Sequence, residues 1–97
     1  MHKYELMYIT RPELTEEQLE AVREKVQNTL KQNGAENVEQ EHFGKRRLAY
    51  EIDNHREGVY TVVTFQGTAE TVNELDRVIK LNDQVLRHMV INIDDKK

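Results

Sequence analysis

Apolar and polar side chains alternate in four stretches of the chain, which is the pattern of β-strands with one buried face. The predicted strands are residues 3–10, 36–52, 59–66 and 85–93. In the first strand, Tyr4, Leu6 and Tyr8 share one face. Met7 and Ile9 lie on the opposite face, so neither face of this strand is fully polar. A hairpin connection is predicted at residues 53–58.

Two other stretches place apolar residues at helical spacing, and they predict helices over roughly residues 15–33 and 69–82. Thr15 and Gln18 form a capping box at the start of the first helix. Either Thr68 or Thr71 caps the second helix. The residues predicted to form the core are Leu6, Tyr8, Leu19, Val22, Val26, Leu30, Val63, Phe65, Leu75, Ile79 and Val90.

The order of these elements is strand, helix, strand, strand, helix, strand. With right-handed crossovers, this order predicts the α+β class and a ferredoxin-like split βαβ fold, βαββαβ. Its four-stranded antiparallel sheet carries both helices on one face. The 97 residues suffice for one domain, predicted over residues 1–93, with residues 94–97 as a flexible C-terminal tail.

Helices on one face leave the other face of the sheet open, and the alternation places apolar side chains there. The predicted partner-binding residues on this face are Met7, Ile9, Tyr60 and Val62. An apolar open face on a small domain indicates a protein partner. Scattered apolar surface residues are the ordinary alternative, but the position of these residues on adjacent strands favours a partner.

The segment GKRRLAYEI, residues 44–52, combines three cations with an alternating strand. The chain as a whole carries a net charge of -4, which argues against nucleic-acid binding through bulk charge. Any contact with RNA must therefore use a local patch, and Lys45, Arg46 and Arg47 are the first candidates. The competing interpretation is that Arg46 or Arg47 only forms a salt bridge with Glu41 or Glu51.

This segment, together with the order of elements, resembles the ribosomal protein S6 family of the bacterial small subunit. The matching positions in the segment are Gly44, Arg46, Leu48, Ala49, Tyr50 and Ile52. The opening strand YELMYITRP and the stretch from Asn82 to Val90 are similar to the family's first and last strands. Asp53 and His2 depart from the family's pattern.

The resemblance implies a structural constituent of the small ribosomal subunit, located on ribosomes in the cytoplasm. It also implies binding to the central domain of small-subunit ribosomal RNA together with ribosomal protein S18. The predicted RNA contacts are His2, Lys3, Lys45, Arg46, Arg47 and Arg87. Because the strands end near shared sheet edges, these six residues are expected to converge on one backbone segment. An acidic protein with an apolar patch needs a basic partner to dock firmly on RNA.

Other functions on this topology find less support. The chain has no cysteine, its four histidines lack metal-ligand spacing, and no phosphate-binding loop is present, so no metal, cofactor or catalytic centre is expected. An acylphosphatase-like enzyme would need a phosphate-cradling loop, but the loop at residues 11–13 is acidic and lacks glycine. An RNA-recognition motif would need aromatic residues on the open face, whereas Tyr4 and Tyr8 are predicted to face the helices. A ferredoxin-like regulatory or dimerisation domain is the remaining alternative.

Overall fold

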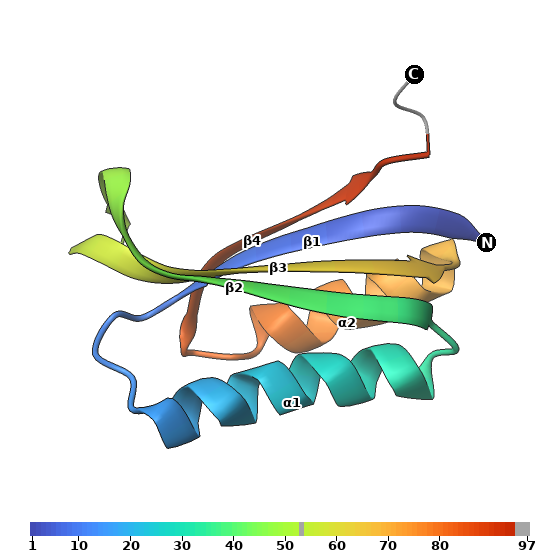
Figure 1. Cartoon of the computed structure of the whole chain (residues 1–97), viewed down its shortest axis with the longest axis horizontal. Coiled ribbons are helices and arrows are strands. Elements are labelled where there is room, and N and C mark those ends of the chain that lie inside the picture. Colours follow the sequence, from blue (N-terminus) through green and yellow to red (C-terminus); the bar gives the residue numbers. More distant parts are fainter. Residues whose placement is uncertain (53, 95–97) are drawn as a thin grey trace.

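The computed structural model of the chain describes residues 1–52 and 54–94 and confirms the predicted fold. The elements are β1 (His2–Thr10), α1 (Glu16–Gln32), β2 (Glu36–Ile52), β3 (His55–Gly67), α2 (Ala69–Lys80) and β4 (Val85–Asn92). All neighbouring strands are antiparallel, in the order β2-β3-β1-β4. Both helices lie on the same side of this sheet (Figure 1). Asp53 and most of the predicted tail fall outside the described residues.

The hairpin connection is shorter than predicted, because β3 begins at His55 and not at residue 59. Strand pairing continues to the pair Ile52 and His55. Asn54 has a φ of 66°, a left-handed conformation that tight hairpin turns require and that asparagine tolerates. The second helix also ends earlier than predicted, at Lys80, and Leu81 is its C-terminal cap.

Both helices begin with a capping box. The Thr15 hydroxyl accepts from the Gln18 amide at 3.2 Å, and the Gln18 side chain accepts from the Thr15 amide at 2.9 Å. In α2, Thr68 is the cap and Thr71 completes the box, which decides between the two predicted positions. The Thr71 hydroxyl also donates to the Asn33 carbonyl at 2.9 Å and so connects the start of α2 to the end of α1.

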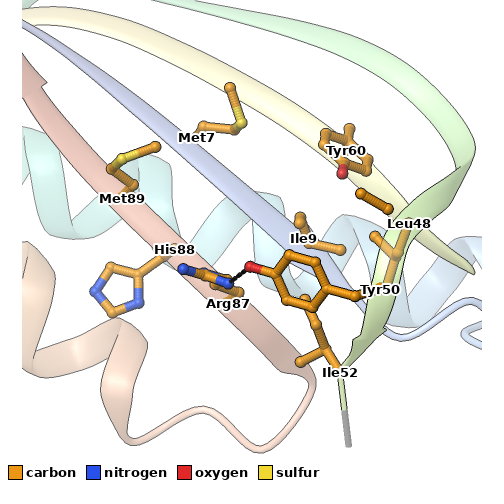
Figure 2. Close-up of a pocket in the computed structure, with 10 residues that line it drawn as sticks. Met7, Ile9, Leu48, Tyr50, Ile52, Tyr60, Arg87, His88 and Met89 are labelled. Carbon is orange, nitrogen blue, oxygen red and sulfur yellow. Dashed lines mark hydrogen bonds between the residues drawn. The ribbon is translucent and has the colours of Figure 1, made fainter. Parts of the chain in front are cut away.

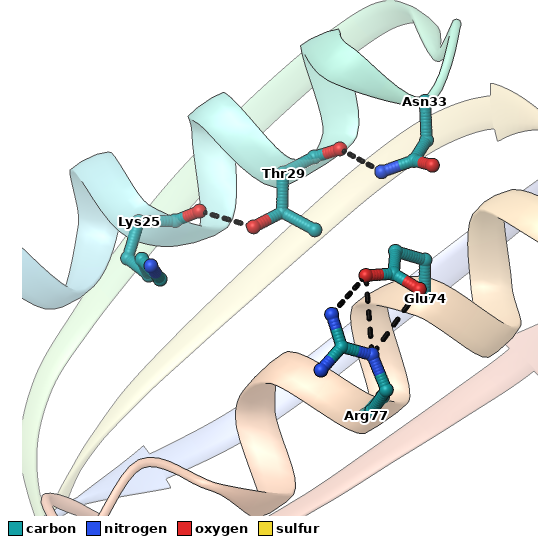
Figure 3. Close-up of polar contacts among 5 residues, drawn as sticks. All are labelled: Lys25, Thr29, Asn33, Glu74 and Arg77. Atoms are coloured by element: carbon teal, nitrogen blue, oxygen red, sulfur yellow. Dashed lines mark hydrogen bonds and ion pairs between the residues drawn. The ribbon is translucent and has the colours of Figure 1, made fainter.

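Side chains also satisfy the backbone near the end of α1 (Figure 3). The Thr29 hydroxyl donates to the Lys25 carbonyl at 2.7 Å, so this buried hydroxyl has a partner. The Asn33 side chain donates to the Thr29 carbonyl at 2.8 Å. On the exposed side of α2, hydrogen bonds from Arg77 lower the pKa of Glu74 below its usual value.

The core lies between the helices and one face of the sheet. Ten of the eleven predicted core residues are buried, and Val90 is partly buried against them because β4 is an edge strand. Tyr4 also joins the core, with its ring centroid 5.6 Å from that of Phe65. Burial raises the pKa of Tyr8, whose side chain is almost fully enclosed. The tyrosines of β1 therefore face the helices, as the alternation predicted.

A hydrogen bond connects α2 to the edge strand β4. The ring of His88 lies on the helix-facing side of β4, and its Nε2 is 2.5 Å from a carboxylate oxygen of Asp76. Lys80 approaches the other oxygen at 3.2 Å. These two partners, His88 first, hold the pKa of Asp76 below its ordinary value. The contact gives β4 a polar attachment to the helix layer in addition to its strand pairing.

Replacing Leu30 by alanine should lower the free energy of unfolding by about 2–5 kcal/mol, because it removes a large side chain from the centre of the core. Leu30 is fully buried. Leu81→Ala is the matched control, since Leu81 is 72% exposed, and it should change stability by less than about 0.5 kcal/mol. Urea unfolding measures both values, and a cost below about 1 kcal/mol for Leu30→Ala would contradict its place in the core.

Asp76→Asn should reduce stability near pH 5 and have little effect near pH 2. The folded state lowers the pKa of Asp76, so its stabilising effect is complete above the unfolded value of about 3.9 and disappears as the pH falls through the folded value. The carboxylate side chain is 39% exposed, so the effect should not exceed about 1 kcal/mol. Urea titrations of both proteins between these two pH values test this, and a constant difference at all pH values would contradict it.

Candidate functional site

Strand pairing arranges the side chains of the open face in rows that cross the sheet. Met7 of β1 pairs with Val62 on one side and Met89 on the other. Ile9 pairs with Tyr60 and Arg87. From β2 to β4, the three successive rows are Gly44–Tyr60–Ile9–Arg87, Glu41–Val62–Met7–Met89 and Glu39–Thr64–Glu5–Ile91. The open face is therefore apolar in its middle and acidic toward one end.

A bulge in β2 changes which side chains face this surface. Glu41 pairs with Val62, but Gly44 already pairs with Tyr60, so β2 contains one extra residue between them. Gly44 has a φ of 79°, which glycine adopts without steric cost. Because side chains alternate, the extra residue moves Arg46, which pairs with Gly58, onto the open face. The pairing shifts again between Arg47 and Ile52, and Leu48, Tyr50 and Ile52 lie beside Ile9 on this face.

Beyond the bulge, the β2–β3 hairpin bends away from the helices (Figure 1). As a result Leu48 and Ile9 are each only 8% exposed, although neither faces the helix layer. The expectation that Ile9 is uncovered is therefore wrong, because the hairpin packs over it. Gly58 permits this packing, since a Cβ built there would lie 2.3 Å from Cγ2 of Ile9. Met7, Tyr60 and Val62 are half-buried on the same face.

Tyr50 and Arg87 meet above the open face although they come from the two opposite edge strands, β2 and β4 (Figure 2). The Arg87 guanidinium donates a hydrogen bond to the Tyr50 hydroxyl. The same guanidinium lies 5.8 Å from the centre of the Tyr50 ring, within range of a cation–π interaction. We call this pair the Tyr50–Arg87 bridge. It holds the bent hairpin across the sheet and positions a cation beside an exposed aromatic ring.

Two hollows lie side by side on this surface. The apolar hollow, of about 260 Å³, lies next to the bridge and is lined by Met7, Ile9, Leu48, Ala49, Tyr50, Ile52, Tyr60, Arg87, His88 and Met89. The acidic hollow, of about 490 Å³, is lined by Glu5, Met7, Glu41, Phe43, Arg46, Tyr60, Val62 and Thr64. Met7 and Tyr60 belong to both, so the two hollows form one continuous surface.

The three cations of the hairpin are exposed at the end of the sheet that carries the bridge. Nε of Arg46 donates to the carbonyl of Phe43 at 3.3 Å. Glu51 instead pairs with Arg56 at 3.1 Å. Within residues 1–52 and 54–94, none of the ion pairs includes Lys45, Arg46 or Arg47. The alternative that Arg46 or Arg47 pairs with Glu41 or Glu51 therefore finds no support in this structure.

The expected convergence of all six cationic candidates is wrong. His2 pairs with Gly67 at the far end of β1, seven residues from Ile9, or about 23 Å at about 3.3 Å per residue. There the His2 ring lies 3.5 Å from the Asp94 carboxylate, which also accepts from the Lys3 amide at 2.8 Å. Arg87, by contrast, shares its row with Gly44 and joins the hairpin cations. The six candidates thus form two separate groups.

Comparison with known proteins agrees with this architecture. The family described as Ribosomal protein S6 matches residues 3–92. The chain belongs to the ribosomal protein S6 family. Ribosomal protein S6 of the 30S subunit from Thermotoga maritima has a similar structure, with 28% identity, a TM-score of 0.90, and coverage of 97% of this chain and 89% of that protein. The de novo designed protein Foldit4 shares the fold alone, with 17% identity, a TM-score of 0.53 and 94% coverage of each chain.

Family membership makes this chain a structural protein of the small ribosomal subunit and not an enzyme. The resemblance found in the sequence is thereby confirmed. Within the described residues, neither helix is long and apolar enough to cross a membrane.

Sequence reasoning on this S6-family chain missed several residues of the open face. Met89 is 52% exposed, and Phe43, which the bulge leaves unpaired, is 45% exposed. The alternation of Arg87, Met89 and Ile91 on the last strand was the available signal for Met89. Tyr50 is 61% exposed, and its contact with Arg87 depends on the bend of the hairpin, which alternation alone does not reveal.

Gly58→Ala should destabilise this S6-family domain by about 1–3 kcal/mol, because the added methyl group overlaps Ile9 where the hairpin folds back. Urea unfolding measures the cost. In an Ile9→Ala background, where the overlapping atom is absent, the same substitution should cost less. Equal costs in both backgrounds would show that contact with Ile9 is not the reason for glycine at this position.

Proposed function

We propose that this chain binds the central domain of small-subunit ribosomal RNA together with ribosomal protein S18, on ribosomes in the cytoplasm. One observation carries the proposal: cations that form no ion pair within the described residues meet an apolar open surface at the same end of the sheet. The family provides the setting in the small subunit. A protein partner on the apolar surface would lie directly beside RNA held by the cations.

The cations suit contacts with phosphate. A chain with a net charge of -4 repels RNA at long range, so attraction must come from a local group of cations. Lys45, Arg46, Arg47 and Arg87 form such a group at the hairpin end of the sheet. His2 and Lys3, at the opposite end, would contact a different segment of the RNA backbone. These contacts would position the RNA without reading its sequence.

The apolar surface suits a protein. Met7, Tyr60 and Val62 form a half-buried centre, and Ile9 forms part of its floor beneath the hairpin. A partner that covers this surface would remove apolar area from water, which favours association. The acidic end of the face, with Glu5 and Glu41, suits a basic protein.

Base stacking on the sheet is not the proposed mode of RNA binding. In RNA-recognition motifs, aromatic residues of the central strands project from the open face. Here Tyr4 and Tyr8 are buried against the helices. Tyr60 remains on the open face, but it lies between the two hollows that we assign to the protein partner.

Arg46→Ala and Arg87→Ala should each weaken the complex with S18 and the RNA fragment, because each removes one contact to phosphate. The slope of log affinity against log salt should fall by about one unit in each variant. Gel-shift titrations at several salt concentrations, with S18 present, give these slopes. Lys31→Ala is the control, since this exposed cation lies at the end of α1 on the helix side.

If the slope of log affinity against log salt is unchanged in both arginine variants, the hairpin end of the sheet does not contact the RNA. If the protein binds neither S18 nor the RNA fragment in these titrations, the proposed function as a whole is contradicted. In that case the alternative of a regulatory or dimerisation domain would be preferred.

A further inference from the structure

The two hollows differ in chemistry although they are adjacent. The apolar hollow is closed on one side by the Tyr50–Arg87 bridge (Figure 2). Its volume of about 260 Å³ lies below the roughly 300–1,000 Å³ of typical small-molecule sites. With walls formed mainly by aliphatic, methionine and tyrosine side chains, it suits one large apolar side chain better than a whole small ligand.

The acidic hollow offers two carboxylates to the same space. Glu5 projects from the central strand β1 and Glu41 from the edge strand β2, one row apart. Neither takes part in an ion pair within the described portion of the chain. Val62 and Phe43 supply an apolar wall beside them. A lysine or arginine side chain fits this combination, since its stem packs on apolar surface while its charge reaches a carboxylate.

We propose that the open face recognises a two-part feature in its protein partner: a large apolar side chain in the apolar hollow and a lysine or arginine in the acidic hollow. This inference rests on the proposed function and specifies the partner chemistry at that site. The rows of Glu41 and Glu5 lie two and four residues along the sheet from the row of Ile9, or about 7 and 13 Å. An extended segment spans that distance with about two to four residues, and a helix with one to two turns.

The charges that line the hollows also determine in which orientation the partner segment binds along the sheet. Arg87 at the bridge would repel a cation placed in the apolar hollow. In the acidic hollow, the two carboxylates of Glu5 and Glu41 outnumber the one cation, Arg46, and attract it. A reversed segment would bring like charges together, and such contacts are a common source of binding specificity. The partner's cation would therefore lie beside Glu5 and Glu41 and away from Arg87, leaving Arg87 available for phosphate.

The experiment measures the affinity of ribosomal protein S18 from the same organism by titration calorimetry at low and moderate salt. Glu5→Gln/Glu41→Gln should weaken binding about tenfold at low salt and reduce its salt dependence. The matched control is Glu17→Gln/Glu24→Gln, which removes two exposed carboxylates from α1 on the helix side.

Met89→Glu places a charge at the mouth of the apolar hollow and should also weaken binding about tenfold. Its control is Leu81→Glu, at an exposed position near the helices.

Unfolding titrations of each variant show whether the monomer remains folded, as expected for exposed or half-buried positions. If the wild-type chain binds S18 and the open-face variants bind within twofold of it, the two-part recognition is wrong while the proposed function stands. If the wild-type chain binds neither S18 nor RNA with S18, both fall. If Met89→Glu instead abolishes self-association in sedimentation experiments, the surface accepts a second copy of this chain and the inference is overturned.

Discussion

The bulge at Gly44 is the constraint on which the open face depends. Before it, Glu39 and Glu41 of β2 face the open side, and after it Arg46 does. The pairing of β2 with β3 shifts again between Arg47 and Ile52, and Leu48, Tyr50 and Ile52 lie beside Ile9 on the same side of the sheet. The two irregularities together give the hairpin an apolar surface that packs over the sheet. The positive φ of Gly44 makes this arrangement accessible at little cost.

The same face carries both signs of charge within a small acidic protein. Glu5 and Glu41 line the acidic hollow together with Arg46, and Arg87 borders the apolar hollow. In the proposed function, a protein partner and a nucleic acid would approach this one continuous surface. Arg87 would take part in both contacts, because it borders the apolar hollow and also lies in the cationic group.

The fold could be predicted almost completely from the sequence, because local patterns specify it. Capping boxes and helical periodicity located both helices, and alternation identified the faces of the strands. The site was predicted less well. The prediction that His2 lies near Arg87 was wrong. The sequence alone does not reveal that β1 extends away from the hairpin, which places His2 nearly the full length of the strand from it. The burial of Ile9 was missed because it depends on contacts between residues far apart in the sequence, such as the close approach of Gly58 to Ile9, which no local pattern reports.

The sheet order also has a consequence for synthesis. The first strand is made earliest, yet it lies in the interior of the sheet, between β3 and β4. Its partners are distant in the sequence, since His2 pairs with Gly67 and Tyr4 with Asn92. The β2–β3 hairpin, by contrast, needs only residues close to each other and can close quickly. On the ribosome, β1 therefore emerges with no neighbouring strand, and its apolar side chains stay unpaired until the second half of the chain follows.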